Sequence, residues 1–177
     1  GRPITLRHLL HHTSGLRDYN DLMILAGHYE ADRTSKQQAL DIIFRQKSLN
    51  FEPGSRFLYS NTGYFLLSAL VEQVSGQSLR DFAAARIFQP LGMTHTQIND
   101  RYNRLIPGRA AGYGGAEAGF ANYMSDWEQT GDGSVFSTVE DLATWAAAFE
   151  TGALAGPALV DSLQAPGRLN DGTPTQM

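Results

Sequence analysis

Apolar side chains recur at helical spacing along most of the 177-residue chain. The strongest example lies at residues 63–74, where the first turns are apolar on nearly all sides. A helix of that kind is buried, and Gly76 offers the left-handed backbone that commonly ends a helix. Residues 34–37 and 137–140 have the composition of capping boxes, which open two further amphipathic helices. The pattern therefore predicts helices joined by loops, with one buried helix at the centre.

These signals predict a mainly α fold class. The expected helices lie at residues 5–12, 35–46, 63–75, 78–88, 138–151 and 157–163, with a further short helix at residues 21–29. Their shared apolar faces predict a core centred on Leu66, Leu67, Leu70, Val74, Phe82, Leu142 and Trp145. A sheet of four or more strands would contradict this fold.

Helical spacing is lost between residues 100 and 135. Glycines alternate there with aromatic residues: Gly112, Gly114, Gly115, Gly119, Gly131 and Gly133 with Tyr113, Phe120, Tyr123 and Trp127. Long loops inside a compact domain are usually functional or disordered, and the aromatic residues argue against disorder. We therefore expect a functional, loop-rich segment at residues 100–135.

Composition narrows the class of protein. The length predicts a single domain over residues 1–177, and 42% hydrophobic residues are enough for a folded core. The formal net charge is −4 and basic residues are scattered, which argues against nucleic acid as a partner. No cysteine is present, so disulfides and thiolate chemistry are excluded. We expect neither a membrane span nor a signal peptide within the chain.

The two ends of the chain carry a separate expectation. The first residue is glycine rather than methionine, and residues 166–177 are polar with no helix cap or strand pattern. These ends predict a piece of a longer protein.

Tyr59 and Asn61 lie just before the predicted buried helix and two residues apart. In an extended segment this spacing puts a phenol and an amide on the same side. A phenol has a pKa near 10, and it can deprotonate a hydroxyl nucleophile only where neighbouring cations lower that pKa. The structural alternative is that Tyr59 is a core aromatic residue and Asn61 caps the next helix.

Four blocks in the chain carry a resemblance to a known family. They are ITLRHLLHHTSGL at residues 4–16, EPGSRFLYSN at residues 52–61, IFQPLGM at residues 87–93 and FSTVEDLA at residues 136–143. Together they resemble the serine β-lactamase-related family, which contains class C β-lactamases, D-alanyl-D-alanine carboxypeptidases, D-aminopeptidases and esterases. The resemblance implies the helical domain of the β-lactamase/penicillin-binding-protein (α+β) fold, without most of its α/β sheet domain.

Two of the three catalytic motifs of that family are missing. The only lysines are Lys36 and Lys47, and no serine stands three residues before either of them, so the chain has no Ser-x-x-Lys. Neither Lys-Thr-Gly nor His-x-Gly occurs. The chain by itself is therefore expected to be inactive, and to fold through its own caps and core.

The resemblance implies acyl transfer to water from an amide or ester in the complete enzyme. Tyr59 would be the general base, its pKa lowered by the family lysine, and Asn61 would hydrogen-bond that lysine and the substrate. Tyr123 and Trp127 are expected to bind substrate, and no cofactor is implied. The expected partners are a small-molecule or peptide substrate, the α/β domain of the same protein and, for the isolated chain, a second copy. The family also favours a periplasmic or secreted location.

Two other classes of function stay open. The chain could be a non-catalytic helical module that binds a partner through an exposed apolar face. His8 and His12 have the i, i+4 spacing of zinc ligands, but Leu9 stands where a metalloprotease has its glutamate. Ordinary polar histidines at a helix end are the simpler interpretation.

Overall fold

The computed structural model describes residues 2–29, 32–116 and 119–175. Its helices are α1 (Leu6–Leu10), α2 (Tyr19–Leu25), α3 (Lys36–Phe44), α4 (Asn61–Ser75), α5 (Leu79–Ala83), the π-helix η1 (Ala84–Phe88), α6 (Val139–Thr151) and α7 (Pro157–Gln164). The strands of the described residues are β1 (Gln97–Ile98), β2 (Tyr113–Ala116), β3 (Gly119–Asn122) and β4 (Val135–Phe136). They form two antiparallel pairs, β1 with β4 and β2 with β3. The mainly α fold class is confirmed.

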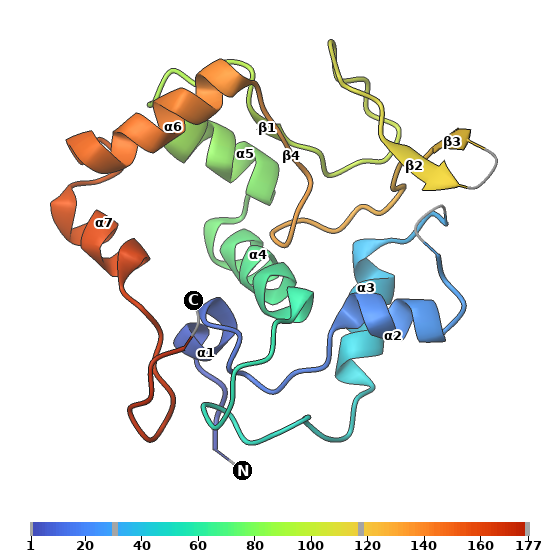
Figure 1. Ribbon diagram of the computed structural model, residues 1–177, viewed down its shortest axis with the longest axis vertical. Helices are drawn as coiled ribbons and strands as arrows, with labels where there is room; N and C mark the ends of the chain where they lie inside the picture. The colour runs from blue at the N-terminus through green and yellow to red at the C-terminus, as the bar shows by residue number, and fades with distance from the viewer. Residues whose placement is uncertain (1, 30–31, 117–118, 176–177) are drawn as a thin grey trace.

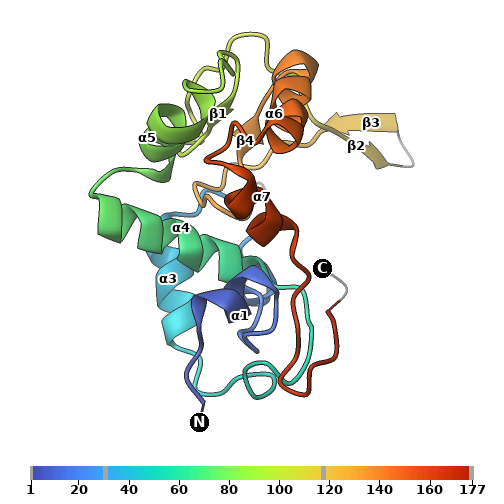
Figure 2. The same ribbon diagram turned by 90° about the vertical axis from the view of Figure 1, so that its left-hand side faces the viewer.

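Helix α4 lies at the centre of the molecule (Figure 1). Helices α1, α2 and α3 pack on one side of it, while α5, α6 and the β1–β4 pair lie on the other side. The view turned by 90° shows the same division, with the β2–β3 hairpin projecting from the part that contains α6 (Figure 2). The segment that contains Tyr59 and Asn61 therefore leads into the helix that joins the two parts.

Local signals set several helix ends, and the two N-terminal caps lie one residue after their predicted positions. Ser35 rather than Thr34 opens α3, in a capping box with Gln38. The Thr138 hydroxyl rather than that of Ser137 caps α6. Gly76 and Gly152 end α4 and α6 in the left-handed conformation, each with φ of 69°.

Five helices differ from their predicted bounds by two residues or more. Helix α3 ends at Phe44 rather than at residue 46, and α4 begins at Asn61 rather than at residue 63. Two of the other three have an identifiable local cause. Helix α1 ends at Leu10, because His12 already has a positive φ of 53°. Helix α2 begins at Tyr19, two residues early, because Asp18 caps it. The helix expected at residues 78–88 changes at Ala84 from α5 to the π-helix η1.

The buried apolar side chains form two clusters rather than one. The first cluster joins α2, α3 and α4 and consists of Tyr19, Met23, Ala39, Ile43 and Phe65. The second cluster lies around α5, η1 and β1 and consists of Ala83, Phe88, Met93 and Ile98. Of the residues predicted to form the core, four are half-buried: Leu66, Leu67, Phe82 and Trp145.

For three of the residues predicted to form the core, the prediction is wrong. Leu70 is 39% exposed, Leu142 54% and Val74 80%. Helix α4 buries the side that carries Phe65 and Ser68 and leaves much of the opposite apolar side uncovered. Periodicity identifies apolar positions, but it does not say which of them tertiary packing covers.

The segment at residues 100–135 contains more regular structure than its sequence predicts. Strands β2 and β3 form a hairpin whose connecting residues 117–118 lie outside the described residues. Gly112 permits this pairing, because a Cβ there would lie 2.3 Å from the backbone oxygen of Tyr123.

The C-terminal segment returns to the turn that precedes the Tyr59 segment, beside α1 in both views (Figures 1 and 2). The Asn170 backbone N–H donates to the carbonyl of Gly54, and its side-chain Nδ2 donates to the carbonyl of Pro53, both at 2.8 Å. A β-bridge between Arg168 and Pro174 gives the segment a strand-like contact that its polar sequence did not predict. In the described part of the chain, no helix has the length and hydropathy to cross a bilayer.

Candidate active site

Tyr59 and Asn61 meet at the start of α4. Tyr59 lies in an extended segment, and its hydroxyl donates a hydrogen bond to Asn61 Oδ1 at 3.0 Å. Tyr59 is 53% exposed, so the residue lies at the surface rather than in the core. The phenol and the amide thus lie on the same side, as their spacing predicts. Neither structural alternative holds: Tyr59 is not a core residue, and Ser60 rather than Asn61 is the residue before α4.

His12 packs against the Tyr59 ring and is bonded to the backbone of the Tyr59 segment. Its ring is 3% exposed and lies 4.5 Å from the Tyr59 ring and 5.3 Å from the Tyr64 ring, centroid to centroid. Its Nδ1 lies 3.2 Å from both the backbone nitrogen and the carbonyl oxygen of Ser60, and the tautomer decides whether it accepts from the first or donates to the second. The His12 carbonyl accepts the backbone N–H of Leu58 at 2.9 Å. Burial lowers the pKa of His12, while the hydrogen bond to Ser60 and the charge of Asp18 act in the opposite direction. Sequence analysis missed this role.

Asp18 holds Asn61 from the other side. Its Oδ2 accepts both the backbone N–H of Asn61 at 2.5 Å and the side-chain Nδ2 at 2.8 Å. The amide nitrogen of Asn61 therefore faces Asp18, and the amide oxygen faces Tyr59. Aspartate before a helix is a recognisable cap signal, but the contact to Asn61 spans 43 residues and has no local signature.

A hollow of about 360 Å³ lies beside Asn61. Its lining comes from the start of α2, the start of α4, the loop between β1 and β2 and the segment at residues 125–136. It includes Tyr19, Asn20, Asn61, Asn99, Arg109, Trp127, Gln129, Asp132 and Phe136. Amide side chains and three aromatic rings thus surround the space, together with one carboxyl and one guanidinium group. Such a lining suits a polar, uncharged group flanked by apolar surface.

Asp132 is a half-buried acid in this lining. Its Oδ2 accepts the hydroxyl of Tyr19 at 2.6 Å. Burial raises the pKa of the Asp132 carboxyl, and the charge of Asp18 acts in the same direction, while the Tyr19 hydrogen bond opposes them. Burial also raises the pKa of Tyr19 well above its usual range, so Tyr19 stays a hydroxyl donor.

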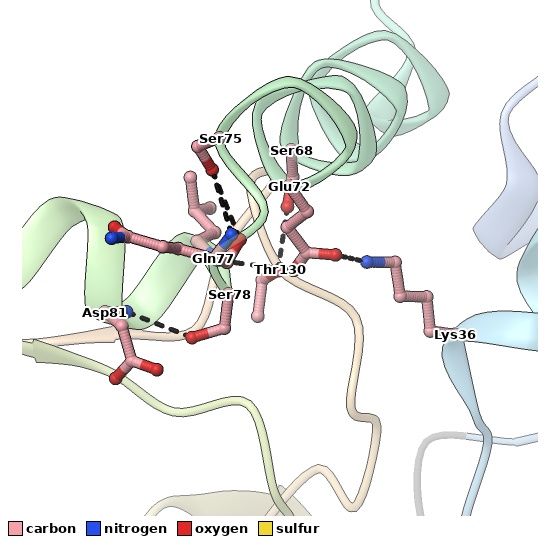
Figure 3. A network of polar contacts seen from close by, with 9 residues as sticks. Lys36, Ser68, Glu72, Ser75, Gln77, Ser78, Asp81 and Thr130 are labelled. Carbon is pink, nitrogen blue, oxygen red and sulfur yellow. Dashed lines mark hydrogen bonds and ion pairs between the residues drawn. The ribbon is translucent and has the colours of Figure 1, made fainter.

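The segment that carries Asp132 is fixed to α4. Thr130 and Ser68 share a hydrogen bond of 2.9 Å, which Figure 3 shows beside the ion pair between Lys36 of α3 and Glu72 of α4. Gly131 has a φ of 101°, and a Cβ there would lie 2.5 Å from the carbonyl oxygen of Tyr64. The close approach therefore requires glycine.

The structure separates the two residues predicted to bind substrate. Trp127 lines the hollow with Asn61, and its Nε1 donates to the carbonyl of Tyr29 at 3.1 Å. Tyr123 follows the β2–β3 hairpin, is 59% exposed and is absent from the described lining of the hollow. Trp127 thus lies where a substrate in the hollow would contact it, whereas Tyr123 lies directly after β3, outside that lining.

His8 and His12 do not lie on one face of a helix, as zinc ligands at this spacing would. His8 belongs to α1 and its Nδ1 accepts the backbone N–H of Thr5, while His12 lies beyond the helix with a positive φ. Among the described residues, no three histidine or acidic side chains are grouped as metal ligands would be.

The family model of Beta-lactamase matches residues 1–176. The chain belongs to the beta-lactamase family. Within this family it is 32% identical over 188 residues to "Penicillin-binding protein 4*" of Bacillus subtilis (strain 168), an alignment that covers 96% of this chain and 40% of that protein. It is 33% identical over 142 residues to a D-aminopeptidase of Cereibacter sphaeroides, covering 80% of this chain and 27% of that protein.

A solved structure of a penicillin-binding protein has the same fold as this chain. The crystal structure of a penicillin-binding protein from Bacillus halodurans superposes with a TM-score of 0.80 and 28% sequence identity. The match covers 92% of this chain and 51% of that one. The resemblance in the four sequence blocks is thereby confirmed, and so is the helical part of the β-lactamase/penicillin-binding-protein fold. The chain spans less than half the length of the two curated relatives described above.

Proposed function

We propose that this chain is the helical part of a serine hydrolase that transfers an acyl group from an amide or ester to water, with Tyr59 as general base. The observation that supports this most directly is the Tyr59 hydroxyl on Asn61 Oδ1 at 3.0 Å. Asn61 also lines the hollow, so a substrate held there lies next to the Tyr59–Asn61 pair. The beta-lactamase family assignment supports the same reaction class.

In this proposal a serine and a lysine come from a part of the protein outside these residues. The lysine lowers the pKa of Tyr59, and the phenolate takes the proton of the serine hydroxyl as the serine oxygen attacks the carbonyl carbon. The proton then passes to the departing amine or alkoxide, which leaves an acyl-enzyme. Water attacks that ester, Tyr59 takes a proton from the water and returns it to the serine, and the carboxylic acid is released.

The two lysines of the chain do not fill the role of the family lysine. Lys36 forms its ion pair with Glu72, far along α4 from Asn61. Lys47 lines a different, mostly apolar hollow beside Phe44. The residue that activates Tyr59 is therefore expected from elsewhere in the enzyme.

For the substrate we propose a β-lactam, a D-amino-acid peptide or amide, or an ester. The names of the relatives, a penicillin-binding protein and a D-aminopeptidase, support this range. Trp127 would form one wall of the acyl site, and Tyr123 would approach the substrate from the hairpin side. The amide side chains of Asn20 and Asn99 in the lining fit the peptide-like part of such a molecule.

An exposed apolar surface between α1 and α7 suggests a binding site for a further partner. A hollow of about 810 Å³ between α1 and α7 is lined by exposed leucines, including Leu6, Leu10, Leu159 and Leu163. Exposed apolar surface of this kind is typical of an interface. We propose that the α/β domain of the same protein covers it, and that two copies of the isolated chain associate through it.

One experiment separates these proposals. The 177-residue chain and the full-length protein are each offered nitrocefin, p-nitrophenyl acetate and D-alanine p-nitroanilide, and their masses in solution are measured. We expect a folded, inactive, self-associating chain and Tyr59-dependent turnover only in the full-length protein. Saturable, Tyr59-dependent turnover by the chain alone would contradict the need for a second domain. A folded full-length protein with no turnover would favour the non-catalytic interaction module.

A further inference from the structure

Asp18 divides its two carboxylate oxygens between two tasks. Oδ1 accepts the backbone N–H groups of Asn20 at 2.8 Å and Asp21 at 3.4 Å, which caps α2. Oδ2 accepts the backbone N–H and the side-chain Nδ2 of Asn61. One side chain therefore starts α2 and also holds the first residue of α4.

The second task decides which way the Asn61 amide faces. The two ends of an amide have nearly the same shape, but one only donates hydrogen bonds and the other only accepts them. A carboxylate only accepts, so it binds the nitrogen end of Asn61 and leaves Oδ1 for the Tyr59 hydroxyl. We propose that Asp18 is a positioning residue, whose carboxylate orients the Asn61 amide so that an acceptor faces Tyr59.

Neighbouring contacts hold the two segments together independently of Asp18. The hydroxyl of Thr62 accepts the backbone N–H of Tyr19 at 2.9 Å and donates to the carbonyl of Arg17 at 2.7 Å. Tyr19 is 1% exposed and Thr62 0%. A change of the Asp18 side chain therefore alters the polarity that Asn61 meets, while the segments stay in place.

The catalytic consequence rests on the proposed function. A lysine that activates Tyr59 needs an acceptor nearby, since an ammonium group only donates. With Asp18 in place, Asn61 Oδ1 is presented on the Tyr59 side, where that lysine would enter. With the amide reversed, an N–H₂ group would face the ammonium group and repel it.

Two substitutions of Asp18 separate orientation from charge. In Asp18→Asn the new side-chain oxygen still caps α2, and the new N–H₂ group faces both the backbone N–H and Nδ2 of Asn61. The backbone N–H of Asn61 then loses its acceptor, whereas the side chain of Asn61 can turn. Two donors cannot pair, so the Asn61 amide reverses and donates to the Tyr59 oxygen. Asp18→Ser also removes the charge and keeps a cap, but it presents no amide and does not force the reversal. Asp21→Asn is the matched control, because Asp21 lies in the first turn of the same helix, whereas the side chain of Asn61 is bonded to Asp18 and Tyr59.

The measurement is the titration of Tyr59 in the chain labelled with ¹³Cζ-tyrosine, with Tyr59→Phe to assign its resonance. A donor to the phenolate oxygen stabilises the charged form, so the pKa of Tyr59 is expected about one pH unit lower in Asp18→Asn than in Asp18→Ser. Asp21→Asn should titrate like the wild type. Equal Tyr59 pKa values in the two Asp18 variants would overturn the proposal, because loss of charge alone would then explain the effect.

A second pair of variants keeps the test decisive if Asp18→Asn does not fold. Asn61→Asp alone places two carboxylates against each other, while Asn61→Asp with Asp18→Asn restores a donor and an acceptor. The double variant should therefore melt at a higher temperature than Asn61→Asp. A lower melting temperature for the double variant would contradict the orienting contact.

Kinetics of the full-length protein complete the comparison. Asp18→Asn should lower kcat/KM about tenfold, the rate equivalent of one hydrogen bond, and Asp21→Asn should not. If the wild-type protein has no activity, the proposed function fails while the titration still decides the role of Asp18. If the wild type is active and Asp18→Asn is equally active, the positioning role in catalysis is wrong.

Discussion

The two hydrophobic clusters differ in what their polar neighbours do. In the first cluster, Tyr19 donates to Asp132, and Thr62 binds the backbone on both sides of Asp18. These bonds connect the core directly to the hollow and to Asn61. In the second cluster, the buried carboxylate of Asp141 accepts the backbone N–H of His95 at 2.8 Å and the hydroxyl of Thr96 at 2.7 Å.

The bonds of Asp141 tie α6 to the segment before β1 and lead to no residue of the Tyr59–Asn61 pair. The first cluster thus supports both folding and the Tyr59–Asn61 pair, whereas the second reaches the candidate site only at a wall of the hollow, where Asn99 follows Ile98. A protein can separate these tasks because substitutions at distant sites that share no partner usually act independently. Variants that damage one cluster at a time test this division.

The largest effect is expected from an atom that does no packing. Tyr59→Phe keeps the ring against His12 and removes the oxygen proposed as the base. In the full-length protein, acylation should fall by roughly 10²–10⁴, the usual contribution of a positioned acid–base group, measured as kcat/KM on a hydrolysed substrate. Tyr113→Phe, on the exposed β2 strand, is the control and should be without effect. Wild-type turnover by Tyr59→Phe would remove Tyr59 from the mechanism.

The next largest effect compares the clusters themselves. Phe65 is fully buried in the first cluster and Phe88 is 9% exposed in the second. Truncation of either to alanine should lower the free energy of unfolding by about 3–5 kcal/mol, measured by urea denaturation. Only Phe65→Ala should also change the Tyr59 resonance, because Phe65 packs against Tyr19 with ring centroids 5.0 Å apart, and Tyr19 is bonded to Thr62 of α4. An equal disturbance of Tyr59 in Phe88→Ala would contradict the division between the clusters.

Substitutions at two glycines test how tightly the segment that lines the hollow is packed against α4. Gly131 and Gly119 both have positive φ, 101° and 114°, but only at Gly131 would a Cβ meet the backbone of Tyr64. Gly119→Ala should cost about 1 kcal/mol of backbone strain. Gly131→Ala should cost clearly more and should displace Asp132, measured by denaturation and by the Tyr19 resonance. Equal losses of unfolding free energy in the two variants would mean that the segment around Gly131 moves away from α4 without a further loss of stability.

The smallest effect is a pH dependence that originates at His12. Burial lowers its pKa in the folded chain below the usual value near 6.5, so the unfolded chain binds the proton more readily. This contribution to stability is present above about pH 6.5 and is lost as the pH falls below it. His12→Asn keeps an acceptor near the position of Nδ1 and suits the positive φ, so it should flatten the decline between pH 7 and 5.

The control for that pH dependence is His95→Asn, an exposed position beside the second cluster. Its unfolding free energy should follow the wild-type pH profile. His8 and His11, whose pKa values are also lowered by burial, leave a residual slope of the same sign in every variant. An unchanged slope in His12→Asn would assign the whole effect to them.

Local chemistry was sufficient to predict the helices and the phenol–amide pair. Ser35, Thr138 and Gly76 act through bonds to residues at most four positions away, so their roles can be read from spacing. The proximity of Tyr59 and Asn61 follows from an extended segment that runs into a helix. The family blocks at residues 4–16, 52–61, 87–93 and 136–143 added the fold around them, which the family match confirms.

Only the tertiary structure decided what surrounds that pair. Asp18 and His12 reach the Tyr59 segment across more than 40 residues, and Asp132 meets Tyr19 across 113. Such contacts depend on how helices dock, and periodicity carries no information about it, which is also why Val74 was misplaced in the core. The sequence by itself determined which groups could react, because that depends on side-chain type and short spacing. The packing of α2 and α4 decided how those groups are oriented, because orientation depends on partners distant in the chain.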